Sequence, residues 1–181
     1  MFKTSNDSPG EAAVFGPYFE DFQAGQVIRH SIGRTISEAD NTWFTLLTLN
    51  TNQMHFNRAY AERSEFGRIL VNSGFSVGLV VGMSVLETSH HAVANLGFEE
   101  IRFPHPIYVG DTIWVETRVL DVRQSRSRHH AGIVRVRTRG LNQDGKVCVT
   151  FVRSFMAFKR DAPETKGLFP EPESAIEEEG E

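Results

Sequence analysis

Residues 71–87 read VNSGFSVGLVVGMSVLE and belong to the most apolar window of the chain, which runs from residue 69 to residue 86. This window approaches the length of a membrane span, but its asparagine, serines and three glycines are better explained by a helix buried in a soluble core. Gly74, Gly78 and Gly82 recur every four residues and therefore share nearly one helix face. We predict a helix over about 71–87 whose glycine face lets a sheet approach its backbone closely.

The second half of the chain carries the alternating pattern of an antiparallel sheet. Asn142-Gln143-Asp144-Gly145 is a hairpin signal between two such stretches, the first of which has arginines on one face. The five expected strands lie near residues 27–36, 94–103, 113–120, 133–139 and 147–151. Helix signals in the first half and strand signals in the second predict an α+β fold with an antiparallel sheet of about five strands.

The segment Asn50-Thr51-Asn52-Gln53-Met54-His55 follows a shorter predicted helix, 37–49, which begins with the cap signal Ser-Glu-Ala-Asp. We expect His55 to fall in a non-helical overhang after that helix. Further on, Leu70-Val71-Asn72-Ser73-Gly74 leads into the long helix, whose first turn would expose unpaired backbone N–H groups. A histidine with an orienting amide, facing a helix N-terminus, suits proton transfer next to a carbonyl that must be polarised.

These residues resemble the MaoC-like, R-specific enoyl-CoA hydratases, whose motif has the form Asp-x-Asn-Pro-x-His. Asn52 and His55 match two of its four specified positions. The segment 67–74 resembles the family's entry into its central helix, and 102–112 resembles its "F-x-x-P-V-x-x-G-D-T" strand entry. The resemblance covers roughly residues 18 to 159. It implies a single hotdog domain, in which a sheet wraps around one long helix. It also implies an acyl-CoA substrate and no separate cofactor, because coenzyme A is part of the substrate.

Two departures from the motif affect the expected chemistry. Asn50 replaces the aspartate that, with the histidine, activates water in the family, and an asparagine cannot accept that proton. Gln53 replaces the proline, which frees a backbone N–H and loosens the turn before His55. This variation resembles a subgroup whose box reads close to Asn-x-His/Asn-Pro-Leu-His and which hydrates branched C4 dicarboxylic acyl-CoAs of the mesaconyl and itaconyl type.

The resemblance implies a role for each matching residue. His55 would transfer the proton, Asn50 would position water or substrate, and the N–H of Gly74 would hold the thioester oxygen. Because Asn50 is no base, His55 would work largely alone or with a carboxylate from elsewhere, such as Glu65. Asn50 and Asn52 could equally be C-cap and turn residues, and Gly74 a packing glycine.

Further residues are predicted to bind the substrate, namely Asn52, Ser73, Arg68, Arg126 and Arg128. The fork of Arg68 could hold a substrate carboxylate, or it could form a surface ion pair with Glu65. Arg126 and Arg128 are candidates for the phosphates of coenzyme A, although a solvated charged loop explains either of them more simply.

Composition excludes several other classes of protein. The net charge of −4 gives no global basic field for nucleic acid. His90-His91 and His129-His130 invite a metal interpretation, but adjacent residues of an extended chain face opposite ways and no cysteine or carboxylate completes a ligand set. We therefore expect no metal. The single cysteine, Cys148, excludes an internal disulfide, is expected to serve packing, and favours a reducing compartment.

The chain is expected to form one domain, 17–160, between an N-terminal extension, 1–16, and an acidic, flexible tail, 161–181. The extension has no apolar segment of the secretory kind, so we expect a cytoplasmic protein without membrane contact. Hotdog domains usually pair at their sheet edges, which would make a homodimer the minimum assembly. Two alternatives to a hydratase remain open: a thioesterase of the same fold, and a non-catalytic acyl-CoA-binding subunit in which loss of the aspartate records loss of chemistry.

Overall fold

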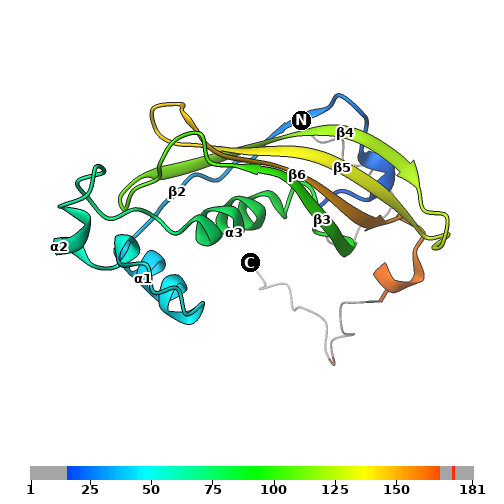
Figure 1. Cartoon of the computed structure of the whole chain (residues 1–181). Coiled ribbons are helices and arrows are strands. Elements are labelled where there is room, and N and C mark those ends of the chain that lie inside the picture. Colours follow the sequence, from blue (N-terminus) through cyan, green and yellow to red (C-terminus); the bar gives the residue numbers. More distant parts are fainter. Residues whose placement is uncertain (1–15, 168–172, 174–181) are drawn as a thin grey trace, which may run out of the picture.

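A long antiparallel sheet curves over helix α3 (Ser73–Ser84) in the computed structural model, which describes residues 16–167 and 173 (Figure 1). The order of strands across the sheet is β1-β4-β5-β6-β3, and the short strand β2 also pairs with β4. The strands are β1 (Val27–Arg29), β2 (Arg34–Thr35), β3 (Ala92–Arg102), β4 (Thr112–Gln124), β5 (Ala131–Leu141) and β6 (Val147–Phe158). Every pairing is antiparallel, as the alternating sequence predicts.

Within the described residues the sheet has six strands rather than about five, because the stretch predicted as one strand, 27–36, is broken into β1 and β2. His30 turns its ring into the interior at the break, where it is 5% exposed. Gly33 lies against the indole of Trp114, where a Cβ would collide with the ring. The hairpin between β5 and β6 is present as predicted, and Gly145 takes a positive φ of 72° there.

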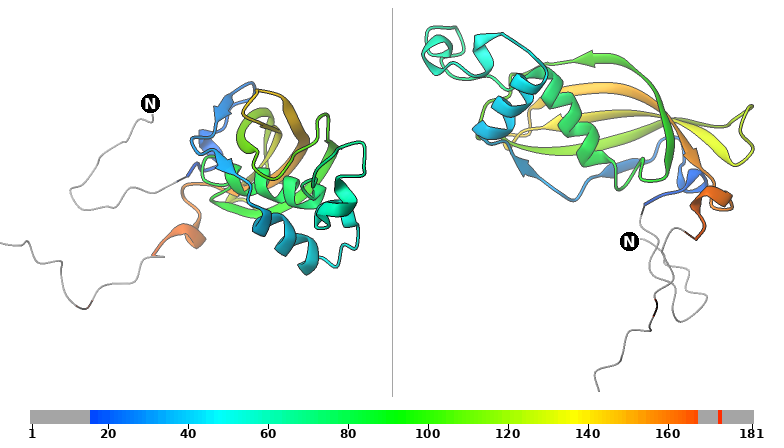
Figure 2. Two further views of the ribbon diagram at one scale, coloured as in Figure 1. Left: turned by 90° about the vertical axis from the view of Figure 1, so that its left-hand side faces the viewer. Right: turned by 90° about the horizontal axis from the view of Figure 1, so that it is seen from below.

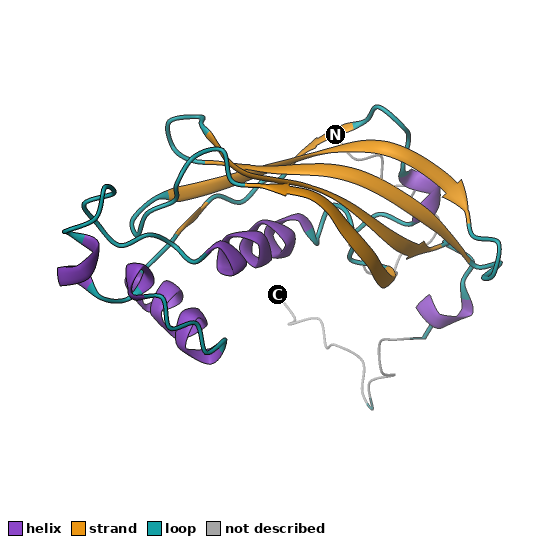
Figure 3. Ribbon diagram, viewed as in Figure 1, coloured by secondary structure: helices purple, strands orange, loops and turns teal. Residues whose placement is uncertain are grey.

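The helices lie at both ends of the sheet, with α3 beneath it (Figures 2 and 3). Helix α1 (Glu38–Leu47) confirms the helix predicted after Ser37, which closes a capping box with Asp40. Helix α3 is shorter than predicted, since Asn72 caps its start and regular helix ends at Ser84. The remaining helical segments are η1 (Phe19–Asp21), η2 (Gln53–His55), α2 (Arg58–Ala61) and η3 (Pro163–Thr165). His55 thus lies in a 3-10 turn, so the expected non-helical overhang was wrong.

Two apolar clusters fill the space inside the sheet. One surrounds α3 and includes Leu79, Val80 and the buried Cys148, whose packing role is confirmed. Burial raises the pKa of the Cys148 thiol. The other cluster lies around Phe155 near η1. All of the predicted extension except Gly16, and most of the predicted tail, lie outside the described residues.

Candidate active site

Asn41 holds the three segments around the predicted histidine site together. Its side chain, in α1, is fully buried. The Nδ2 group donates to the carbonyl oxygens of His55 (2.8 Å) and Leu70 (3.1 Å), and Oδ1 accepts from the N–H of Asn72 (2.8 Å). One amide therefore joins α1, η2 and the lead-in to α3. A buried amide that makes three hydrogen bonds is a strong constraint on position, because each partner would be costly to leave unsatisfied.

His55 is oriented by a hydrogen bond from its own ring. Nδ1 lies 3.0 Å from the carbonyl oxygen of Leu70. A carbonyl oxygen can only accept, so Nδ1 carries the hydrogen and the lone pair of the neutral ring is on Nε2. Among the described residues, the structure shows no hydrogen-bond partner for Nε2. The backbone is held as well, because the N–H of Leu70 donates to the carbonyl of Met54 at 3.1 Å. The half-buried ring therefore presents a fixed, unoccupied basic nitrogen.

The start of α3 is capped more fully than the sequence suggests. The Oδ1 atom of Asn72 accepts from the N–H of Gly74 at 2.9 Å, and its Nδ2 group donates to Thr45 at 3.2 Å. The N–H predicted to be free at Gly74 is therefore occupied in this state, and it can reach a thioester oxygen only if the Asn72 side chain releases it. Within the described residues, the structure shows no acceptor for the N–H groups of Ser73 and Phe75. These two donors complete the positive end of the helix.

Asn50 and Asn52 both shape the turn that leads to His55. The Oδ1 atom of Asn50 accepts from the N–H of Asn52 at 2.9 Å, and the Oδ1 atom of Asn52 accepts from the N–H of Met54 at 3.1 Å. These are the local side-chain-to-backbone bonds that asparagine makes in turns. Asn52 thus has the turn role considered for it, and its contact with substrate stays a prediction. The amide NH2 of Asn50 is left to contact a substrate, and its positioning role stays a prediction.

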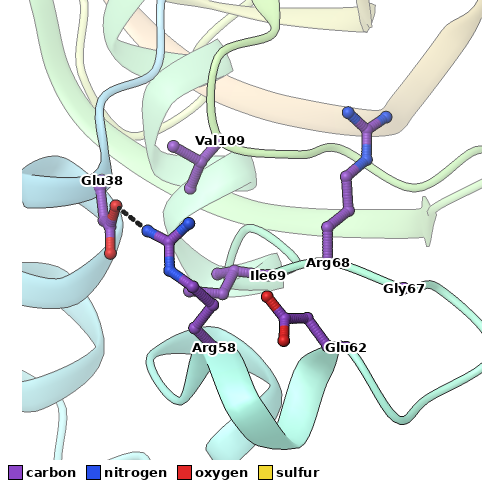
Figure 4. A pocket seen from close by; sticks show the side chains of 7 residues that line it. All are labelled: Glu38, Arg58, Glu62, Gly67, Arg68, Ile69 and Val109. Atoms are coloured by element: carbon purple, nitrogen blue, oxygen red, sulfur yellow. Dashed lines mark hydrogen bonds and ion pairs between the residues drawn. The ribbon is translucent and has the colours of Figure 1, made fainter.

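Arg68 lines a pocket formed by Glu38, Arg58, Glu62, Gly67, Arg68, Ile69 and Val109. Figure 4 shows Arg58 bonded to Glu38 on one side of this pocket, while Arg68 extends away on the other. The guanidinium of Arg68 lies over the ring of Tyr108, 3.6 Å from its centroid. No ion pair with Glu65 is present among the described residues. Arg68 therefore keeps its charge available to an anion beside the residues that hold His55.

Arg126 and Arg128 lie far from this site within one chain. Tyr108 forms a bridge with Leu70 next to His55, and β4 then runs for 13 residues toward the β4–β5 turn that carries both arginines. At about 3.3 Å per residue this places them roughly 40 Å along the strand. Figures 1 and 2 show that turn at the opposite end of the sheet from α1 and α2. Within a single chain they therefore do not join the other predicted site residues, and their contact with the phosphates of coenzyme A stays a prediction.

A groove runs along the face of α3 that the glycines occupy. Its lining consists of Arg34, Phe44, Phe75, Gly78, Leu79, Gly82 and Met83. A Cβ built on Gly78 or Gly82 would meet nothing within 4 Å. The predicted close approach of the sheet to this face is therefore wrong. The close approach between sheet and helix is instead at Gly140 of β5, where an added Cβ would lie 2.7 Å from Val80.

The sequence did not predict the roles of Asn41 and Thr45 or the side-chain bonds of Asn72. Asn41 and Thr45 are four residues apart on the buried side of α1, and both are fully buried. Their spacing was a usable signal, since two hydrogen-bonding residues on one helix face can share a partner. No group of three or more potential metal ligands occurs within the described residues. None of the helices in that part of the chain is long and apolar enough to cross a membrane.

Comparison with known proteins adds independent information. A family model described as mesaconyl-CoA hydratase matches residues 5–181. The chain is 34% identical over 158 residues to a mesaconyl-CoA hydratase of Cereibacter sphaeroides, covering 86% of this chain and 46% of that protein. It is also 34% identical over 154 residues to a beta-methylmalyl-CoA dehydratase of Chloroflexus aurantiacus, covering 83% and 44%. The chain thus spans about half the length of the curated relatives it matches.

Solved structures agree on the fold. A putative MaoC domain protein dehydratase from Chloroflexus aurantiacus superimposes with a TM-score of 0.78 at 31% identity, covering 93% of this chain and 46% of the other. A Mycobacterium tuberculosis protein with a double hotdog fold gives a TM-score of 0.73 at 24% identity, covering 83% and 46%. The architecture described above is therefore a hotdog fold, as the motif resemblance implies.

Proposed function

This chain belongs to the mesaconyl-CoA hydratase family, and from that premise we propose that it adds water to, or removes it from, the carbon–carbon double bond of an acyl-CoA thioester. The proposed substrate is a branched C4 dicarboxylyl-CoA such as mesaconyl-CoA. The names of the relatives support the reaction class, but each relative is about twice as long. The observation that carries the proposal for this chain is the free Nε2 of His55, held next to the first turn of α3.

In the proposed hydration, Nε2 of His55 takes a proton from water as the oxygen bonds to the β-carbon of the enoyl group. The π-electron pair moves toward the thioester, whose oxygen gains enolate-like charge. The first turn of α3 stabilises that charge through its N–H groups, including Gly74 once Asn72 releases it. The protonated ring then gives its proton to the α-carbon, so His55 acts first as base and then as acid. Asn50 contributes only orientation.

Substrate contacts are proposed for Asn52, Ser73 and Arg68, with Arg68 binding an anionic part of the acyl-CoA. Its guanidinium is stacked but not ion-paired, so it loses no internal partner by doing so. Arg126 and Arg128 can serve the phosphates of coenzyme A only if a second copy of the chain brings them to the site.

A homodimer is part of the proposal. Strand β3 forms one edge of the sheet, and its neighbourhood exposes apolar side chains at Leu96, Phe98, Ile101 and Phe103. An unpaired apolar edge favours pairing with another sheet. The relatives that are about twice as long support this view, because a second copy of this chain would occupy the place of their additional half.

The test is to measure the enoyl-thioester absorbance band over time when purified protein is mixed with crotonyl-CoA, mesaconyl-CoA or itaconyl-CoA. We expect loss of the band without release of free thiol, fastest with a dicarboxylyl substrate. Release of thiol with the double bond intact would identify a thioesterase instead. Binding of acyl-CoA without turnover of any substrate would identify a non-catalytic subunit. Sedimentation at the assay concentration checks the dimer.

A further inference from the structure

The groove along α3 contains one charged side chain, Arg34, and we propose that Arg34 binds the free carboxylate of the acyl group. This proposal rests on the proposed hydratase function and names the residue that makes it selective for dicarboxylyl substrates. The other six lining residues are aromatic, aliphatic, sulfur-containing or glycine. A carboxylate entering such a groove would find no other opposite charge among the residues that line it.

The groove begins where the thioester is expected to bind. Phe75 directly follows Gly74, and its ring packs edge-on against Phe44 with 5.5 Å between centroids. A Cβ on Gly74 would come within 3.3 Å of the Phe44 ring. The first turn of α3 and the aromatic end of the groove are thus in contact. From that turn the groove continues along α3, where Gly78 and Gly82 leave space for an acyl group whose thioester oxygen meets the turn.

Arg34 is held in place without using up its binding capacity. Its Nη2 donates to Oδ1 of Asp40 at 2.6 Å. Asp40 is itself fixed, because the N–H and the hydroxyl of Ser37 both donate to its Oδ2. The Ser37 N–H and hydroxyl, with the charge of Arg34, hold the pKa of Asp40 below its usual value despite the opposing effect of burial, so the anchor is ionised at neutral pH.

The remaining donors of Arg34 are available. Within the described residues, the structure shows no acceptor for Nε or Nη1, and the side chain is 48% exposed. A guanidinium offers five N–H donors in a planar fork that matches a carboxylate in a bidentate way. Arg34 is therefore positioned to bind a further carboxylate, unlike an arginine whose donors are all used in a surface ion pair.

The experiment compares kcat/KM for mesaconyl-CoA with kcat/KM for crotonyl-CoA, which lacks the carboxylate, in wild type, Arg34→Gln and Arg34→Lys. Loss of a charge-assisted contact predicts a fall of about 10- to 100-fold for mesaconyl-CoA with Arg34→Gln. The same variant should change kcat/KM for crotonyl-CoA by less than about threefold, since this substrate has no free carboxylate for Arg34 to bind. Arg34→Lys should recover part of the loss, because it restores the charge but not the fork.

Two control variants make the result specific. Arg137→Gln removes an arginine paired with Glu100 on the outer side of the sheet and should leave both values unchanged. Arg68→Gln tests the other candidate for the carboxylate. Thermal unfolding checks that each variant is folded, which is expected because the Arg34–Asp40 pair is exposed to solvent.

Equal losses for both substrates with Arg34→Gln would overturn the proposal, as would a selective loss with Arg68→Gln alone. A shift of Arg34→Gln toward monomer with unchanged selectivity would also overturn it, because the groove would then be an interface between copies. These outcomes leave the hydratase function standing if the wild type is active. A wild type that hydrates neither substrate would instead defeat the proposed function itself.

Discussion

His30 and His55 lie at opposite ends of α3 and differ in what their second ring nitrogen can do. His55 bonds through Nδ1 to Leu70, just before the helix, and Nε2 has no partner among the described residues. His30 bonds through Nδ1 to the Glu87 carboxylate, just after the helix, at 2.9 Å. Its Nε2 lies 2.9 Å from the hydroxyl of Thr117. Both rings are fixed by Nδ1, but only the ring of His55 keeps a nitrogen free.

The His30 end has the residues of a hydrolase triad and yet is the less suitable site. Glu87, His30 and Thr117 form an acid–histidine–hydroxyl series, but Thr117 is 1% exposed and also bonds to Thr138 at 3.0 Å. No substrate can reach that hydroxyl without opening the core. Residue types and spacing alone therefore do not separate the two histidines. The accessibility of the second ring nitrogen does.

The sharpest test of this contrast is His55→Ala. Turnover on the best enoyl-CoA should fall by about 100- to 10,000-fold, because the group that moves the proton is lost. The free energy of unfolding should fall by only about 1 kcal/mol, the net worth of one hydrogen bond. Turnover is measured by enoyl-thioester absorbance and stability by urea unfolding.

His105→Ala is the matched control, since His105 also bonds through Nδ1 to a carbonyl oxygen, that of Val147 at 2.9 Å, on the surface. It should keep wild-type turnover. Near-normal activity of His55→Ala, or an equal loss in the control, would remove the distinction drawn between the two ends of the helix.

The next largest effect is expected at Asn41, which supports only the His55 end. Asn41→Leu keeps the approximate volume but leaves the His55 carbonyl and the Asn72 N–H without partners, and the Leu70 carbonyl keeps only the bond from Nδ1 of His55. We expect the free energy of unfolding to fall by about 3 kcal/mol, since each buried unsatisfied group costs about 1–3 kcal/mol and the structure can relax. Turnover should fall too, because η2 and the lead-in to α3 are no longer joined.

Urea unfolding measures the loss, with Asn95→Ala on the exposed part of β3 as the control. The control should stay within about 0.5 kcal/mol of wild type. If both variants unfold at the same denaturant concentration as wild type, Asn41 does not organise the site.

The sequence predicted the elements better than it predicted their surroundings. Hydrophobic periodicity gave α1, α3 and the long strands, because burial of one face imposes a period that can be counted. It did not reveal Asn41, whose polar side chain breaks the apolar pattern of α1 yet is buried by its three partners. Periodicity shows which residues share a face but not what that face meets.

The site was predictable only in part for the same reason. His55 and the start of α3 follow each other closely in the chain, so local signals could place them together. Arg126 and Arg128 could be separated from them only by knowing where the β4–β5 turn points. The Asn72 side chain on the Gly74 N–H depends on a rotamer, which no spacing rule supplies.

Two glycines, Gly78 of α3 and Gly140 of the facing strand β5, should give smaller effects of opposite sign on stability. Gly78→Ala should raise the free energy of unfolding by about 0.5–1 kcal/mol, because alanine is the better helix former and its Cβ meets open space. Gly140→Ala should lower it by about 1–3 kcal/mol, because its Cβ would overlap Val80 and Val149. Urea midpoints measure both. A destabilised Gly78→Ala would mean that the groove face of α3 is packed against something.

The smallest effect is expected at the His30 end, where Glu87→Gln should change the acid dependence of stability rather than turnover. Burial by itself raises the pKa of the Glu87 carboxyl, but the hydrogen bond and charge of His30 outweigh it and hold the pKa below its usual value. A lowered pKa in the fold stabilises above the unfolded pKa, and this contribution is lost as the pH falls through the folded pKa. Wild type should therefore have a higher melting temperature than Glu87→Gln at pH 7, and this difference should disappear below about pH 4.5.

The control is Glu65→Gln, at an exposed position, which should show no such difference from wild type. A loss of turnover with Glu87→Gln at pH 7, with melting unchanged, would show instead that the acid–histidine–hydroxyl series takes part in the chemistry, and the two ends of α3 would have to exchange their roles.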